Sequence, residues 1–321
     1  MVIVVAFVWG LPQFADYQQV WAQLRQLDSA VVPFLLFVGA ANLVAPSTAQ
    51  CAALPGLRLR DALAVDWVTS TVTNLVPGGS ALAIGLTWKM YRSVQLSTEA
   101  ITRSIVVTGV WDAFVKLGTP LIAISWLATQ RPVSFTLVQA AIFGAVMFAI
   151  ALGLLAVVLT GPATARRLGR LVNRLRFLGS GWPQRLDDLR QETVSLLAGR
   201  WRQLTFWTVA GHFNLYLLLV LCLRAVGVER SVLGLAPVLA AFAFGRLATA
   251  IPITPGGLGV LEVALIGALG ATAEAPEASL VAAVLLFRFA TLVLPIPLGA
   301  ISWVWWSTSP RTAASVASST G

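Results

Sequence analysis

The sequence predicts an all-α polytopic membrane protein, with residues 1–321 forming a single membrane domain. Of the 321 residues 58% are hydrophobic and only 11% are charged, and the mean hydropathy is +0.83. A chain this apolar and this long is expected to cross a membrane several times. Its apolar stretches are long enough for helices and lack the short alternating segments of an outer-membrane barrel.

The N-terminal residues 1–9 form an apolar stretch that is shorter than the ~20 residues a membrane-spanning helix needs. They lack the basic start and the small-residue cleavage site of a secretory signal peptide. An incomplete, tilted helix and a truncated first helix both fit this pattern. Residues 30–54 are long enough to cross the membrane, and the charges that follow them predict a crossing from outside to inside.

The next apolar segment, residues 62–87, contains a helix breaker in its middle, Asn74-Leu-Val-Pro77-Gly78-Gly79. Each half is too short to cross a bilayer alone. We expect a re-entrant hairpin, because irregular backbone at membrane depth must be buried in protein or line a water-filled cavity. A hairpin that enters from the cytoplasm keeps the neighbouring basic residues there, as the positive-inside rule prefers: Arg58, Arg60, Lys89, Arg92 and Arg103.

A helical pair is predicted next, over residues 104–128 and within the connecting span 129–160. The segment after this pair, residues 161–203, carries nine arginines against three acidic residues. We expect it to be a cytoplasmic loop, because basic loops are retained there and are attracted to anionic headgroups. The flanking membrane spans argue against nucleic-acid binding, so the expected partner of this loop is the bilayer.

A second broken hairpin is predicted further along the chain. Residues 204–226 cross outward, and residues 231–272 are again apolar but interrupted at Pro252 and at Pro255-Gly256-Gly257. By the same reasoning the interrupted segment is a re-entrant hairpin, which now enters from outside.

A long last span over residues 277–307 and a disordered cytoplasmic tail over residues 308–321 complete the predicted order. Two units of helix, broken hairpin and helix result, at 30–128 and 204–307, with extra N-terminal and central helices. Their orientations in the membrane are opposite. This is the inverted-repeat design of secondary transporters, in which discontinuous helices meet near the midplane of the bilayer.

Charged residues within the spans are candidate binding residues, because a charge at the centre of a membrane helix costs roughly 2.5–3.5 kcal/mol. Asp112 and Lys116 are spaced i, i+4 and can neutralise each other. Glu262 and Arg288 can meet as well. In both pairs a structural ion pair and a substrate contact are alternatives. Arg288 and Arg246 are the favoured headgroup contacts, since arginine suits bidentate phosphate recognition.

The two breaks contribute further candidate binding residues. Glycine lets the backbone approach a ligand closely, and a half-helix that begins after Pro-Gly-Gly points free N–H groups and a positive dipole end at the cavity, which attracts anions. Close helix packing is the alternative role of these glycines. His212 and Asp66 have no identifiable partner and are expected to be structural. The candidates at the breaks are Asn74, Pro77, Gly78, Gly79, Thr254, Pro255, Gly256 and Gly257.

No catalytic residue, metal site or cofactor is predicted. The chain has one histidine, and its two cysteines, Cys51 and Cys222, lie far apart in apolar segments. These residues leave almost no ligands for a metal and make a disulfide improbable.

Three motifs in the second half of the chain carry a specific signal. They are Thr249-Ala-Ile-Pro252-Ile-Thr254-Pro255-Gly-Gly-Leu-Gly259-Val-Leu-Glu262, Leu286-Phe-Arg288 and Pro295-x-Pro297-x-x-Gly299. Together they resemble the lysylphosphatidylglycerol synthase/flippase transmembrane family, which includes the flippase half of the multiple peptide resistance factor. The earlier break and Asp112 match the first element of that family more loosely, since Gly109-Val110-Trp111 stand where many members carry a Glu-Arg pair.

The resemblance implies lipid translocation rather than aminoacyl transfer, since no soluble acyltransferase-like domain follows Gly299. We therefore expect a transporter or flippase of an anionic phospholipid or lipid-linked headgroup in the cytoplasmic (inner) membrane. Two alternatives stay open. One is a scaffold or accessory subunit for a lipid-modifying or glycosyl-transferring enzyme, and the other is an integral-membrane enzyme acting on lipid-linked substrates. A homo-oligomer or a partner enzyme is compatible with each.

Overall fold

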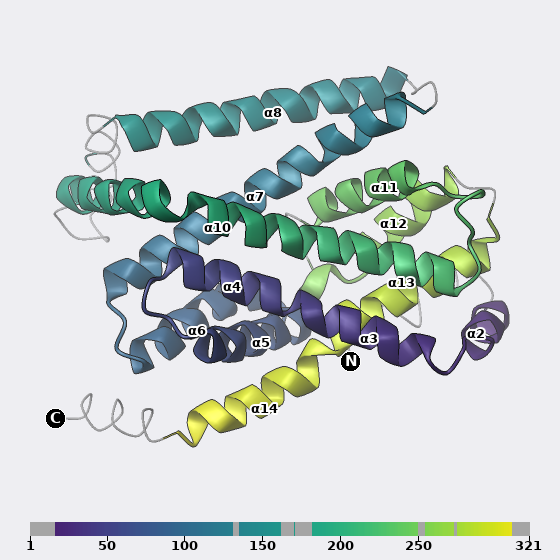
Figure 1. The fold of residues 1–321 in the computed structure, drawn as a ribbon, viewed down its shortest axis with the longest axis horizontal. Helices are drawn as coiled ribbons and strands as arrows, with labels where there is room; N and C mark the ends of the chain where they lie inside the picture. Colours follow the sequence, from purple (N-terminus) through teal and green to yellow (C-terminus); the bar gives the residue numbers. More distant parts are fainter. Residues whose placement is uncertain are drawn as a thin grey trace.

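The computed structural model describes residues 17–130, 135–161, 170, 182–249, 254–272 and 275–309, so residues 1–9 and most of the tail lie outside the described part. Within these residues every regular element is a helix (Figure 1). In chain order the elements are α2 (Tyr17–Arg25), α3 (Val31–Asn42), α4 (Val44–Ala53), α5 (Leu59–Leu75), α6 (Gly79–Ser93), α7 (Thr98–Ala128), α8 (Phe135–Thr160), α10 (Trp182–Ala225), α11 (Leu235–Ala248), the 3-10 turn η3 (Pro255–Gly257), α12 (Val260–Gly270), α13 (Glu277–Arg288), the π-helical turn η4 (Phe289–Val293) and α14 (Pro295–Ser307).

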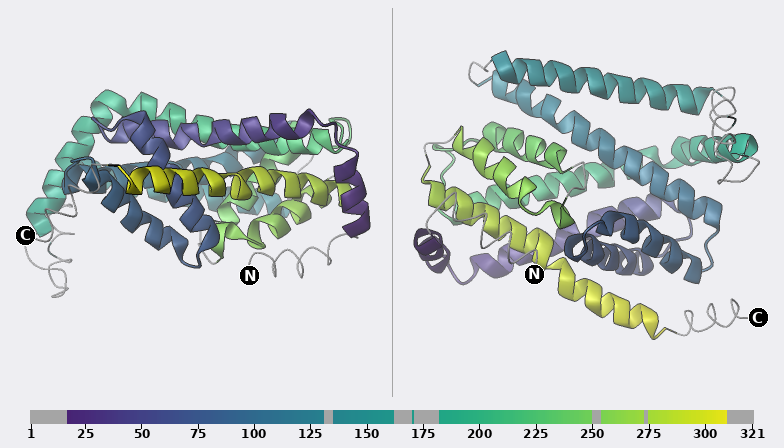
Figure 2. Two further views of the ribbon diagram at one scale, coloured as in Figure 1. Left: turned by 90° about the horizontal axis from the view of Figure 1, so that it is seen from below. Right: turned by 180° about the vertical axis from the view of Figure 1, so that it is seen from behind.

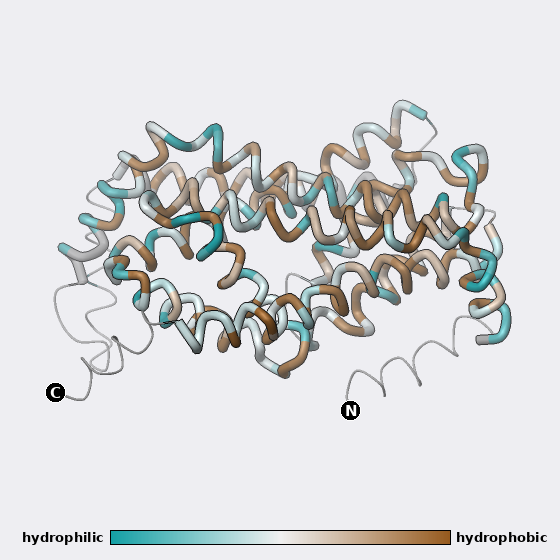
Figure 3. Tube along the Cα trace, turned by 60° about the horizontal axis from the view of Figure 1, so that its bottom comes forward, coloured by the Kyte–Doolittle hydropathy of each residue, from teal (hydrophilic) through white to brown (hydrophobic). Residues whose placement is uncertain are grey.

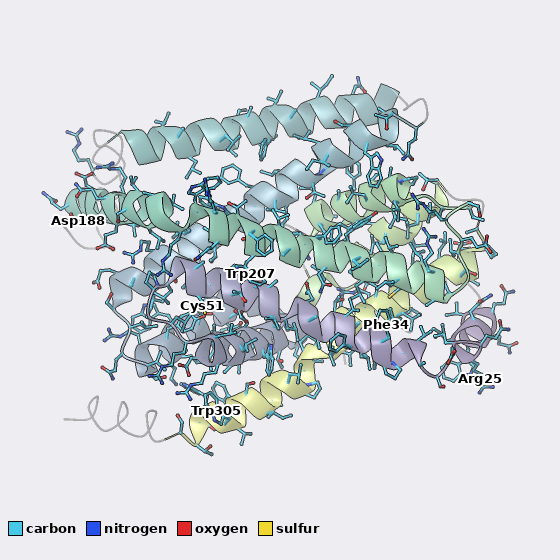
Figure 4. All side chains as sticks on the ribbon, in the orientation of Figure 1. Arg25, Phe34, Cys51, Asp188, Trp207 and Trp305 are labelled. Carbon is cyan, nitrogen blue, oxygen red and sulfur yellow. The ribbon has the colours of Figure 1, made fainter. Side chains whose placement is uncertain are left out.

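Four helical segments in the described part are long and apolar enough to cross a membrane: Val31–Ala53, Thr98–Ala128, Asp187–Ala225 and Glu277–Ser307. Apolar residues fill the middle of the helices and hydrophilic residues gather mainly at their two ends (Figure 3). Large apolar side chains on the outer faces are exposed, among them Phe34 on α3, which Figure 4 labels. The predicted all-α, multi-pass membrane protein is therefore confirmed.

The predicted crossing at 30–54 consists of two consecutive helices, α3 and α4, that meet at Leu43. The interruption lies three residues before Pro46. Because proline has no backbone N–H, Pro46 cannot donate a hydrogen bond to the carbonyl of Asn42, one helical turn earlier. The last predicted span, 277–307, is likewise divided by η4, two residues before Pro295.

The second half of the predicted 161–203 loop is helical in the structure. Residues 182–203 form the first part of α10, which runs on without interruption into the following span. Figures 2 and 4 show this part of α10, with Asp188 labelled, projecting at one end of the molecule. Pro183 lies in the first helical turn, where proline is tolerated. The residues that follow are mostly strong helix formers, and a count of charges does not register this propensity.

The two broken segments form two helical hairpins. In the first, α5 packs against α6, and in the second, α11 packs against α12. Figures 1 and 2 place the two hairpins in opposite halves of the long dimension of the molecule, with their breaks towards the middle. The inverted relation between the units 30–128 and 204–307 stays a prediction.

The helices around the second hairpin share the largest hydrophobic core. Buried residues of α10, α11, α12 and α13 meet in it, with Leu218, Leu219 and Leu223 of α10 almost fully enclosed. A second core cluster joins α5 and α6 to the start of α7 and the end of α14. The last span thus contributes to both cores, α13 to the first and α14 to the second.

Candidate functional site

A cavity of about 530 Å³ lies between the two hairpins. Its walls come from α3, α4, α5, α6, α7, α10, α11, the second break, α12 and the divided last span. The volume falls within the range of pockets that hold small ligands. Seven of the thirteen predicted binding residues line it: Asn74, Lys116, Arg246, Thr254, Gly256, Gly257 and Arg288.

The second break is packed into the cavity wall. Gly256 and Gly257 adopt positive φ angles of 56° and 67°, a conformation that glycine adopts without strain. A Cβ atom at Gly256 would lie 2.9 Å from both the Asn74 Oδ1 atom and the Leu292 Cδ1 atom. Only a glycine therefore lets the second break approach the first hairpin and the last span this closely.

An ion pair holds the second break in place. Arg288 Nε lies 2.7 Å from Glu262 Oε1, and Arg288 Nη2 donates a hydrogen bond of 2.8 Å to the carbonyl oxygen of Gly256. Both side chains are buried, with residue exposures of 4% for Arg288 and 6% for Glu262. The expected meeting of these two residues is present, and its geometry favours the structural alternative: Arg288 ties α13 to α12 and to the break.

Arg246, near the end of α11, also lines the cavity but has no such partner. Its Nε atom is buried and makes no hydrogen bond to any residue that the structure describes. No ion pair to a described acidic residue is present either. Arg246 is thus a cation at the cavity wall whose charge is not neutralised by direct contact.

Asp112 contacts both Lys116 and His212 in a cluster of three polar residues. Lys116 Nζ lies 2.6 Å from Asp112 Oδ2, as the i, i+4 spacing predicts, and His212 Nε2 lies 2.9 Å from Asp112 Oδ1. Of the three residues only Lys116 lines the cavity. No partner of His212 could be identified from the sequence, because Asp112 comes into contact with it only through the packing of α7 beside α10, which joins residues 100 positions apart. Its structural role stays a prediction.

The first break reaches the cavity through Asn74 alone. Its Nδ2 atom donates a hydrogen bond of 3.1 Å to the carbonyl oxygen of Leu292 in η4. Pro77 and Gly78 are exposed at the tip of the hairpin and do not line the cavity. Gly79 is buried because it starts α6 directly against the backbone of Val72 in α5, which agrees with the packing alternative for this glycine.

Three further predicted binding residues do not line the cavity: Asp112, whose side chain is 43% exposed, and the buried Pro255 and Glu262. Each has a physical reason. The two carboxylates are turned towards their cationic partners, and Pro255 is buried as the first residue of η3. Asp66, for which the sequence identified no partner, lies within hydrogen-bond distance of Ser47 on the neighbouring helix α4.

Unpartnered polar atoms gather around the cavity. Asn42 Oδ1, Arg246 Nε and Thr254 Oγ1 are buried without a hydrogen-bond partner in the described part of the chain, and all three residues line this one cavity. An unsatisfied buried polar group costs about 1–3 kcal/mol. None of the described lining residues is acidic. The arrangement suits a polar ligand that carries negative charge.

The described residues contain no group of three or more His, Cys, Asp or Glu side chains that could hold a metal ion.

The residues of the cavity fall within the region that matches a known protein family. Residues 1–299 match the model of the lysylphosphatidylglycerol synthase TM region, a range that includes every lining residue of the cavity. A comparison with curated proteins finds no match.

Proposed function

The chain belongs to the lysylphosphatidylglycerol synthase TM region family, and on this premise we propose that it moves an anionic lipid headgroup across the cytoplasmic membrane. The headgroup occupies the cavity between the two hairpins while the acyl chains stay in the bilayer. The arginine-rich end of α10 and the C-terminal tail face the cytoplasm in this proposal.

The observation that carries this proposal is the unpaired Arg246. A cation in a membrane span is costly and is normally neutralised or functional. The other two cations at the cavity are paired, Lys116 with Asp112 and Arg288 with Glu262. Arg246 alone has a free charge and a free buried N–H donor among the described residues. A phosphate oxygen would satisfy both, with the bidentate geometry that guanidinium groups favour.

Neutral polar groups around Arg246 support the same kind of ligand. The cavity wall is rich in hydroxyl and amide side chains, which can hydrogen-bond a phosphate and the polar part of a headgroup. They come from α3, α5, α6, α11, the second break and η4: Asn42, Thr69, Ser70, Thr73, Asn74, Ser80, Thr87, Thr249, Thr254 and Thr291.

A lipid-translocation assay tests the proposal. Purified protein is reconstituted into vesicles that contain a fluorescent anionic phospholipid, and the label in the outer leaflet is quenched chemically to follow movement between leaflets. For Arg246→Gln we expect movement to slow at least tenfold, since a hydrogen bond to a charged group contributes about 1.5–3 kcal/mol.

Arg202→Gln is the matched control. Arg202 lies on α10, is exposed and stacks over Trp201 outside the cavity, so its loss removes the same charge without touching the site. We expect this variant to move lipid at the wild-type rate. Equal rates for Arg246→Gln and wild type would refute the assignment of Arg246 to headgroup binding, and no movement by the wild type would refute the transport proposal.

A further inference from the structure

Asp66 is a membrane-embedded carboxyl group outside the cavity that the proposed function does not use. It lies on α5 of the first hairpin, and its Oδ2 atom is 2.5 Å from Ser47 Oγ on α4. Ser47 is completely buried, with 0% exposure. The contact therefore lies at the interface between the hairpin and the span before it, away from exposed loops.

The hydrogen bonds around Ser47 can accommodate a proton on Asp66. Ser47 Oγ is also 3.1 Å from the carbonyl oxygen of Leu43, one turn earlier on the helix. A serine hydroxyl has one hydrogen to donate, and a carbonyl oxygen has none. With Asp66 ionised, Ser47 shares its one hydrogen between Asp66 and Leu43. With Asp66 protonated, each contact has its own hydrogen, since Ser47 can donate to Leu43 while the Asp66 carboxyl group donates to Ser47.

The surroundings of Asp66 agree with a neutral carboxyl group. Asp66 interacts electrostatically with Cys51 on α4 and Tyr91 on α6, as does Asp61 at the start of α5, and none of these groups is a cation. The packed helix α14 has no titratable side chain.

The nearby cations are directed elsewhere. Lys89 and Arg92 of α6 are exposed, and Arg92 stacks over Trp88 and donates to the carbonyl oxygen of Leu96. Arg60, at the start of α5, pairs with Asp61. Asp66 is half-buried and has no ion pair within the described residues, and a charge without a partner in a membrane span is costly.

The proton on Asp66 lies one helical turn from the cavity. Thr69 and Ser70, three and four residues further along α5, line the cavity, and so does Leu43, whose carbonyl accepts from Ser47. Thr69 Oγ1 also lies 3.2 Å from the backbone carbonyl oxygen of Asp66. A movement of α5 relative to α4 would separate Asp66 from Ser47 and bring its carboxyl group towards water in the cavity.

We infer that Asp66 is a proton-binding site and that the first hairpin takes up and releases this proton as the headgroup moves. In the release step the carboxyl O–H bond breaks, its electron pair stays on Asp66, and the proton passes to a water molecule. Uptake reverses the step. The coupling to lipid movement rests on the proposed function, whereas the binding of the proton by Asp66 does not.

Infrared difference spectroscopy of the purified protein in detergent tests proton binding directly. At neutral pH we expect the C=O stretch of a protonated carboxyl group in the wild type and its loss in Asp66→Asn. This substitution is isosteric with the protonated acid and can still donate to Ser47, so the fold is expected to persist. Asp61→Asn, on the same helix, should keep the band, and Ser47→Ala should shift it by removing the hydrogen-bond acceptor. Identical spectra for wild type and Asp66→Asn would overturn the assignment.

The coupling is tested in vesicles with and without an imposed pH gradient. We expect a gradient of one direction to accelerate lipid movement by the wild type, and Asp66→Asn to lose this acceleration while it retains movement without a gradient. An equal gradient response in both proteins would overturn the coupling. If the wild type moves no lipid under either condition, the transport proposal fails, and the infrared band still decides whether Asp66 binds a proton.

Discussion

The two Pro-Gly-Gly breaks have nearly the same sequence but different surroundings. In the first, Pro77 and Gly78 are exposed, and a Cβ atom placed on Gly78 would meet nothing within 4 Å. In the second, Pro255 is buried, and Gly256 packs against Asn74 and Leu292 while Arg288 binds its carbonyl oxygen. The first break reverses the chain, whereas the second forms part of the cavity wall.

This difference shows that the motif alone does not assign a role to its glycines. Both Gly78 and Gly256 need a positive φ angle, 68° and 56° respectively, so the same residue type is required in both turns. What separates them is the buried Glu262–Arg288 pair, which has no counterpart among the described residues of the first break. Three sets of substitutions test how far this contrast extends.

The largest effect is expected from Arg288→Met. It leaves Glu262 as a buried carboxylate without its partner and frees the Gly256 carbonyl, so we expect a loss of about 3–5 kcal/mol in stability. Chemical or thermal unfolding in detergent measures this loss. The double variant Glu262→Met/Arg288→Met removes both charges and should recover much of it. A single variant as stable as the wild type would show that the pair does not hold the second break.

A smaller effect is expected from alanine at the two positive-φ glycines. Gly78→Ala and Gly256→Ala both carry the left-handed backbone penalty of about 1–2 kcal/mol. Gly256→Ala adds contacts of its Cβ atom with Asn74 and Leu292 at 2.9 Å, and overpacking of this kind costs about 1–3 kcal/mol more. Unfolding of the two variants side by side measures the difference. Equal losses would mean that the second break is no more constrained than the first.

The smallest effect is expected from Asn74→Ala, which removes the one hydrogen bond between the first hairpin and the carbonyl of Leu292. A single neutral hydrogen bond contributes about 0.5–1.5 kcal/mol to stability. Thr71→Val is the comparison, because Thr71 Oγ1 makes a similar bond of 2.9 Å to the carbonyl of Pro295. Both should lower the unfolding temperature slightly, and a loss as large as that of Arg288→Met would contradict the ranking.

Features that depend on local spacing could be predicted from the sequence. The breaks at Pro77 and Pro255 follow from proline and glycine in apolar segments, and the Asp112–Lys116 pair follows from its i, i+4 spacing. Contacts across helices could not be predicted in the same way. His212 with Asp112, and Ser47 with Asp66, depend on which helices are neighbours and on their rotation about their axes.

Because contacts across helices could not be predicted, the sequence predicts the candidate site only in outline. Sequence reasoning found the three cations of the cavity, Lys116, Arg246 and Arg288. The spacing predicts the pair of Lys116 with Asp112, and a meeting of Arg288 with Glu262 is expected. That Arg246 has no such partner could not be predicted, because it depends on which side chains the neighbouring helices place beside it. Most of the hydroxyl groups on the cavity wall come from residues that look ordinary in a membrane helix, and only the packing of the first hairpin against η3 and the last span brings them together.

The divided last span has a mechanical consequence. Its first half, α13, packs on α12 of the second hairpin, and its second half, α14, packs along α5 of the first. The two halves meet in the five-residue turn η4, which Asn74 also contacts. The last span therefore links the two hairpins, with α13 packed on one, α14 packed on the other and η4 between them beside the cavity. Any rocking of one hairpin against the other has to bend the span at η4 or separate one of its halves from its hairpin.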